Sequence, residues 1–136
     1  MAHVLFLCHQ NAGRSQMSQA LFDQAARGRH SSDSAGTRPA NRVHPQVVEV
    51  MDESGIDLSG QIPRRLGREA IERADVVVTM GCGDECPYVP GKRYLDWDLP
   101  DPSNRPVDEV RNIRDEIARR ITGLIRDLDQ GAGAAR

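Results

Sequence analysis

The chain has neither the long apolar segments of a membrane protein nor the charge excess of a nucleic-acid-binding protein. No apolar run approaches the roughly 18 residues that a membrane-spanning helix needs. With 18 basic and 20 acidic residues the formal net charge is −2, which leaves no basic face to release counterions from a phosphate backbone. The sequence does not begin with a charged and apolar signal segment. We therefore expect no membrane partner, no nucleic-acid partner and a cytoplasmic location.

Cysteine is also scarce. The chain has three cysteines, Cys8, Cys82 and Cys86, and an odd number of them does not form a complete disulfide framework. In a reducing compartment such residues more often serve catalysis, redox chemistry or metal binding. Their spacing and the lack of a histidine near Cys82 and Cys86 disfavour zinc, so we expect no metal and no tightly bound cofactor.

The most informative segment begins at a cysteine and ends with an Arg-Ser pair. It reads Cys8-His9-Gln10-Asn11-Ala12-Gly13-Arg14-Ser15. An apolar run precedes it and a helix-like stretch follows it, which predicts a strand-to-helix loop. The backbone N–H groups of such a loop converge on a tetrahedral oxyanion at the positive end of the helix, and the guanidinium of Arg14 grips two of its oxygens. Cys8 is the predicted nucleophile, with its thiolate favoured by these donors and by the Ser15 hydroxyl.

Strand-like and helix-like segments alternate along the chain, which is typical of a parallel sheet wrapped by helices. We expect an α/β fold, a single doubly wound domain over residues 1–130 with a four-stranded parallel sheet flanked by helices, and a flexible tail at residues 131–136. The expected strands are Val4 to Leu7, Ser31 to Ala35, Asp75 to Met80 and Arg93 to Asp96. The expected helices are Ser15 to Ala26, Pro45 to Ser54, Glu69 to Arg73 and Val107 to Leu128.

Four segments follow predicted strands or lie close to them. They are the Cys8 loop, the Ser34-Ala35-Gly36-Thr37 turn, the loop from Cys82 to Cys86, and the loop that holds Asp101-Pro102. Doubly wound sheets place their sites outside the carboxyl ends of the strands. We therefore expect these four segments to meet at one edge of the sheet.

These motifs together resemble those of a known family. They are Val-Leu-Phe-Leu-Cys8-x5-Arg14-Ser15-Gln16-Met17, Ser34-Ala35-Gly36-Thr37, Val77-Val78-Thr79-Met80, Cys86-Pro87 and Trp97-x3-Asp101-Pro102. Over residues 3 to 128 the chain resembles the arsenate reductases built on the low-molecular-weight protein tyrosine phosphatase fold. The Arg-Ser-Gln-Met run and the downstream Cys-Pro favour the reductases over the phosphatases.

The resemblance implies a role for each matching position. Cys8 attacks arsenate held in the loop from His9 to Arg14, Arg14 stabilises the transition state, Ser15 supports the thiolate, and Asp101 is the general acid. A resolving cysteine then attacks Cys8, arsenite departs, and a second cysteine carries the disulfide to the surface for reduction by thioredoxin. Cys86 matches this second cysteine. Cys82 is the candidate for the first, although Gly81 stands where the family has its cysteine directly after the strand, so which of the two attacks Cys8 stays open.

The residues themselves support a reductase. Reducing arsenate takes two electrons, which thiols must supply, whereas a phosphatase of this type needs one cysteine because water releases its phospho-enzyme. Gly13 replaces the second cysteine that phosphatase loops commonly carry before the arginine. Ser103 replaces the aromatic residue that follows Asp-Pro in the phosphatases, so little is available to stack on a phosphotyrosine ring.

Other interpretations stay open at this point. The reductant is thioredoxin or, in a related branch, mycothiol with a glutaredoxin-like partner and Cys8 as the only essential cysteine. The chain is alternatively a low-molecular-weight phosphatase, or an anion-binding or redox-sensing module without turnover. Asp96 and Asp98 compete with Asp101 for the acid role. Some relatives hold a potassium ion near the loop, and because Gln19 replaces one of its acidic contacts we expect no strong potassium site.

Overall fold

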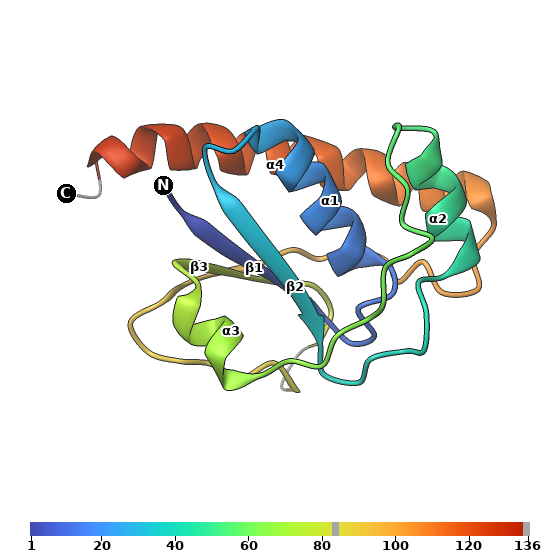
Figure 1. The fold of residues 1–136 in the computed structure, drawn as a ribbon, viewed down its shortest axis with the longest axis horizontal. Helices are drawn as coiled ribbons and strands as arrows, with labels where there is room; N and C mark the ends of the chain where they lie inside the picture. The colour runs from blue at the N-terminus through green and yellow to red at the C-terminus, as the bar shows by residue number, and fades with distance from the viewer. Residues whose placement is uncertain (83–84, 135–136) are drawn as a thin grey trace.

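The computed structural model describes residues 1–82 and 85–134 (Figure 1). The strands are β1 (His3–Cys8), β2 (Ser31–Gly36), β3 (Val76–Thr79) and β4 (Arg93–Asp96). They form one four-stranded sheet in the order β2-β1-β3-β4, and every neighbouring pair is parallel. The helices are α1 (Arg14–Ala26), α2 (Pro45–Asp52), α3 (Arg68–Arg73) and α4 (Val107–Ala134). The predicted α/β architecture with a four-stranded parallel sheet is confirmed.

The two faces of the sheet pack in two hydrophobic clusters, which follow from the alternation of side chains along β1. Val4, Phe6 and Cys8 belong to the larger cluster, which includes residues of α1, α2 and α4. Leu5 and Leu7 belong to the smaller cluster, which includes residues of β3 and α3. Figure 1 shows α1, α2 and α4 on one side of the sheet and α3 on the other. The interior strands β1 and β3 are buried on both faces, which explains why they are nearly continuous apolar runs in the sequence.

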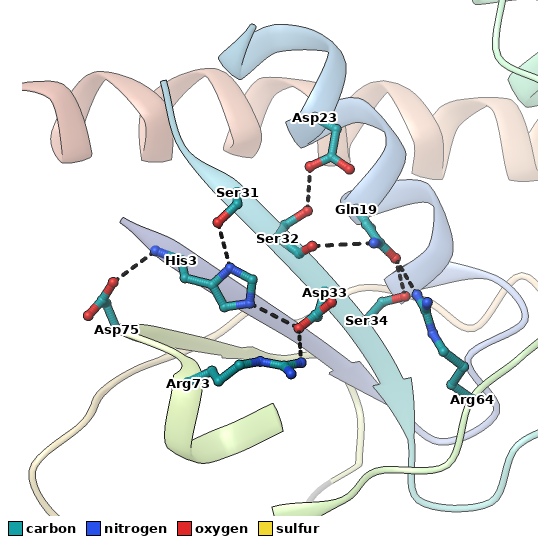
Figure 2. Close-up of polar contacts among 10 residues, drawn as sticks. All are labelled: His3, Gln19, Asp23, Ser31, Ser32, Asp33, Ser34, Arg64, Arg73 and Asp75. Atoms are coloured by element: carbon teal, nitrogen blue, oxygen red, sulfur yellow. Dashed lines mark hydrogen bonds and ion pairs between the residues drawn. The ribbon is translucent and has the colours of Figure 1, made fainter. Parts of the chain in front are cut away.

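Edge strand β2 is polar, and its side chains are paired with neighbouring elements (Figure 2). The ring of His3 lies 2.6 Å from Ser31 Oγ and 2.9 Å from Asp33 Oδ2, and Arg73 Nη2 donates to the same carboxylate oxygen at 2.7 Å. Partial burial opposes ionisation of Asp33, but the hydrogen bonds from His3 and Arg73 outweigh it and hold the pKa of Asp33 below its usual value. These tertiary contacts hold a segment of low strand propensity in the sheet.

Helix α4 is longer than predicted. It continues past Leu128 to Ala134. Extending an existing helix adds one hydrogen bond for each residue fixed, so the Gly- and Ala-rich end joins the helix although glycine has a low helix propensity. The predicted tail at residues 131–136 is thus helical as far as 134, while 135–136 lie outside the described residues, and its flexibility stays a prediction. Within the described residues, no helix is both long and apolar enough to cross a membrane.

Candidate active site

The segment from Cys8 to Gly13 joins β1 to α1 at the carboxyl edge of the sheet, as predicted. Its carbonyl groups accept hydrogen bonds from residues further along the chain. The donors are Thr37 N–H to Cys8 (3.2 Å), Arg38 N–H to His9 (2.7 Å), Ala40 N–H to Gln10 (3.0 Å) and His44 N–H to Ala12 (2.9 Å). Because the N–H and C=O of a peptide unit point in opposite directions, these bonds turn the N–H groups of the loop toward its centre. Together with the N-terminus of α1, they form a cradle suited to an anion.

The side chains of the loop differ in exposure. Ala12 and Gly13 are buried, whereas Gln10 is exposed. The His9 ring is partly exposed, with Nδ1 3.3 Å from Thr37 Oγ1. These positions therefore serve the cradle chiefly through their backbone.

Cys8 lies at the base of the cradle as a free, buried thiol with 2% of its surface exposed. Its sulfur is 2.9 Å from Ser15 Oγ. Asn11 Nδ2 donates to the same Ser15 oxygen at 2.8 Å. Since Ser15 Oγ already accepts from Asn11, its own hydrogen is available to donate to the Cys8 sulfur. The geometry thus allows Ser15 to stabilise a Cys8 thiolate.

Asn11 is the centre of a buried hydrogen-bond network that fixes the loop. Its φ is 51°, a left-handed conformation that asparagine tolerates. Its Oδ1 accepts from Gln16 Nε2 at 3.0 Å and from the Arg64 N–H at 2.8 Å, and its Nδ2 donates to Ser34 Oγ at 3.0 Å. Ser34 Oγ in turn donates to Gln19 Oε1 at 2.6 Å, and Arg64 Nη2 donates to that oxygen at 3.0 Å (Figure 2). The loop is therefore shaped by the protein before any anion binds.

The structure brings Arg14 and Asp101 together. The Arg14 side chain is buried, with Nη1 donating to the Leu99 carbonyl at 3.1 Å and Nη2 lying 3.8 Å from Asp101 Oδ2. Asp101 is 55% exposed, so it is accessible for proton exchange with water. The rival Asp96 instead accepts a hydrogen bond from Thr79 Oγ1 at 2.8 Å, which ties it to the end of β3. Of these two carboxylates, Asp101 is therefore the one that lies beside Arg14.

His44 stands at the start of α2, where its backbone N–H bonds to the cradle. Partial burial and the nearby charge of Arg14 lower the pKa of His44 below its usual value, against the opposing effect of Asp101. The imidazole is therefore mostly neutral at neutral pH. The positive charge beside the cradle comes from Arg14.

The other two cysteines form a disulfide between Cys82 and Cys86, with their Cα atoms 5.5 Å apart. Cys82 is 2% exposed and belongs to the smaller cluster, whereas Cys8 belongs to the larger one. Cys86 is only partly buried. The residues between them, 83–84, lie outside the described part of the chain. Among the described residues, no group of three or more His, Cys, Asp or Glu side chains is placed to hold a metal ion.

Sequence reasoning did not identify several residues that shape the site. Gln16 is 2% exposed and donates a hydrogen bond to Asn11. Its place in the Arg-Ser-Gln-Met run, next to Met17 at the start of the predicted helix, was the signal that could have identified it. Arg64 and Leu99 contribute backbone groups, which leave no trace in residue type.

Comparisons with known proteins identify the family to which the chain belongs. The model of the family "Low molecular weight phosphotyrosine protein phosphatase" matches residues 3–133. A Halobacterium salinarum protein assigned as an arsenate reductase is 41% identical over 129 residues, which cover 91% of each chain. A glutaredoxin arsenate reductase of Synechocystis is 33% identical over 128 residues, 92% of this chain and 97% of that one.

Among solved structures, a thioredoxin-dependent arsenate reductase of Corynebacterium glutamicum superposes with a TM-score of 0.82 and 40% identity. The match covers 96% of this chain but 63% of that protein, so this chain spans less than two thirds of its length. The family match extends over nearly the whole chain and includes every segment of the site. The chain therefore belongs to the low molecular weight phosphotyrosine protein phosphatase family.

Proposed function

We propose that this protein is an arsenate reductase that converts arsenate to arsenite through a cascade of its three cysteines. The observation that carries the proposal is that a free, buried Cys8 in an oxyanion cradle coexists with a Cys82–Cys86 disulfide. This is the state that such a cascade leaves at its end, with the nucleophile regenerated and the two electrons withdrawn from the other pair. The kinship with arsenate reductases supports the same reaction.

In the proposed first step, the Cys8 thiolate attacks the arsenic of bound arsenate and an arsenic–oxygen bond breaks. The loop N–H groups and Arg14 stabilise the negative charge that develops on the remaining oxygens. Asp101 gives a proton to the departing oxygen, which leaves as water. Ser15 holds the thiolate in place by its hydrogen bond. This step changes no oxidation state and is the one that the reductase shares with the phosphatases of the fold.

The electrons move in the second step. The Cys82 thiolate attacks the Cys8 sulfur, the electron pair of the sulfur–arsenic bond passes to arsenic, and arsenite departs from the new Cys8–Cys82 disulfide. The Cys86 thiolate then attacks Cys82 and releases the Cys8 thiolate. We assign the attack on Cys8 to Cys82 because Cys86 is the more exposed of the two, which suits it to an external thiol. Since Cys82 packs in the smaller cluster in the disulfide form, it must leave that cluster to reach Cys8.

An external dithiol then reduces the Cys82–Cys86 disulfide and is itself oxidised to a disulfide. We propose thioredoxin for this role and the cytoplasm as the compartment, because reduced thioredoxin is available there. The thioredoxin-dependent relative supports this choice, while the glutaredoxin-type relative supports the alternative of a low-molecular-weight thiol such as mycothiol with a glutaredoxin-like partner.

The decisive experiment follows arsenate-dependent NADPH oxidation with thioredoxin and thioredoxin reductase. It compares the wild type with Cys82→Ser and Cys86→Ser, and Cys8→Ser serves as the inactive control. We expect steady turnover in the wild type and none in the variants, with at most one arsenite released per molecule of Cys86→Ser. Turnover of both variants with mycothiol or glutathione and a glutaredoxin, but not with thioredoxin, would instead establish the branch that needs Cys8 alone.

A low-molecular-weight phosphatase is the second candidate, which the family match favours. It shares the first step and needs neither Cys82 nor Cys86. Hydrolysis of p-nitrophenyl phosphate that is equal in the wild type and both cysteine variants, without arsenite from any thiol system, would establish the phosphatase. Binding of oxyanion without either product would leave only a binding module.

A further inference from the structure

Gly81 joins the end of β3 to Cys82, and its backbone lies against the guanidinium of Arg14. Its φ is +80°, in the left-handed region that favours glycine. A β-carbon at this position would collide with Arg14 Nη1 and would lie 3.1 Å from Cζ and 3.3 Å from Nη2. Glycine suits this position for two reasons, the backbone conformation and the close approach to Arg14, whose guanidinium would have to move to make room for a β-carbon.

The Arg14 guanidinium is confined on its other sides as well. Nη1 donates to the Leu99 carbonyl, and Nη2 faces the carboxylate of Asp101. Gly81 supplies a third wall, made of backbone alone. A planar guanidinium binds two oxygens of an anion only in one orientation. The groups packed around the Arg14 guanidinium therefore affect how tightly it binds the anion.

We propose that Gly81 is a positioning residue for oxyanion binding, which confines the Arg14 guanidinium to its place beside the loop by close backbone contact. Because Gly81 directly precedes Cys82, the same short segment serves the anion cradle and the redox pair. This inference rests on one part of the proposed function, namely that the loop from Cys8 to Arg14 binds an oxyanion.

The test separates the contact with Arg14 from backbone strain. Gly81→Ala adds a steric clash with Arg14 and backbone strain. The matched control Gly91→Ala adds backbone strain alone, because Gly91 has a φ of +90° and no atom within 4 Å of its β-carbon position. The probe is inorganic phosphate, which protects Cys8 from alkylation by iodoacetamide. Mass spectrometry of the Cys8 peptide gives the alkylation rate without phosphate and the phosphate concentration that halves it.

We expect Gly81→Ala to need about tenfold more phosphate for half-protection, the scale of one weakened hydrogen bond to a charged group. Gly91→Ala should need as much as the wild type. The alkylation rate without phosphate is measured for each of the three proteins, and half-protection is expressed relative to that rate, because displacing the Arg14 charge also changes the reactivity of the Cys8 thiolate.

Equal protection of Gly81→Ala and Gly91→Ala would overturn the inference, and so would a wild type that phosphate does not protect. Protection that is lost only in Gly81→Ala, in a protein that releases no arsenite with any thiol system, would support the inference while the proposed function fails.

Discussion

Asn11 Nδ2 and Ser15 Oγ lie 2.8 Å apart, and this hydrogen bond sets the direction of the next one. By donating to the serine oxygen, the asparagine amide leaves the serine hydrogen free for the sulfur of Cys8. Asn11 thus orients the Ser15 hydroxyl toward the Cys8 sulfur, although it makes no hydrogen bond to that sulfur itself.

Replacing Ser15 with alanine removes the hydroxyl that lies 2.9 Å from the Cys8 sulfur. We expect alkylation of Cys8 by iodoacetamide at neutral pH to slow by about tenfold, since hydrogen bonds to charged groups contribute on this scale. The matched control is Ser18→Ala, in the same helix, whose buried hydroxyl donates to the Arg14 carbonyl at 2.7 Å. An equal slowing in both variants would contradict a specific role for Ser15.

Asn11→Ala should destabilise the protein by about 3 kcal/mol, because it leaves buried partners unsatisfied and places alanine in a left-handed conformation. The control Asn104→Ala has a similar φ of 60° at an exposed position, so it reports the backbone cost alone. Urea unfolding measures both. The interpretation of Asn11 as the centre of the network fails if the two variants lose the same stability.

Gly36→Ala tests the close approach of β2 to the cradle. A β-carbon there would lie 2.6 Å from the His9 carbonyl oxygen and 2.9 Å from the Asn11 nitrogen. Because both are backbone atoms, the cradle itself must move, and we expect a loss of about 1–3 kcal/mol together with weaker phosphate binding. Gly60→Ala, with open space at its β-carbon position, is the control for both measurements.

The ion pairs of Glu53 predict a change of stability with pH. Glu53 accepts hydrogen bonds from Arg111 and Arg114 of α4, and these lower the pKa of Glu53 to about 2. A carboxylate with a lowered pKa in the folded state stabilises it fully above its usual value of 4.5, and this contribution is lost as the pH falls toward 2. In urea unfolding, the difference in stability between wild type and Glu53→Gln should therefore shrink between pH 5 and pH 2.5, and a constant difference would contradict the pairing.

Strands β1 and β3 could be predicted from the sequence because burial on both faces makes them continuous apolar runs. The Cys8 to Ser15 segment was equally predictable, since its chemistry resides in residue types at fixed spacing. Helix α4 begins at the predicted Val107, but its end was less predictable because Gly131, a residue type that usually marks a helix end, lies inside the helix.

The supports of the site were harder to predict. Arg14 and Asp101 meet through the fold of a long loop, and in the sequence the choice of Asp101 over its rivals Asp96 and Asp98 depended on the Asp-Pro match to the family. The bonds from Arg64 N–H to Asn11 and from Arg14 to the Leu99 carbonyl use backbone groups that every residue has. Such contacts depend on the position of the backbone, which residue types do not encode locally.

The polar pairing along β2 has a consequence for how the molecule behaves in concentrated solution. Strand β2 lies at the edge of the sheet, and its outer edge is the place where a second copy of the chain could add a strand and start aggregation. At the carboxyl end of β2, the Gly36 N–H donates to the Arg64 carbonyl and the Leu66 N–H donates to the Gly36 carbonyl, so this part of the edge is already paired. The end of the strand that frames the anion cradle is thereby closed to a further strand from another copy.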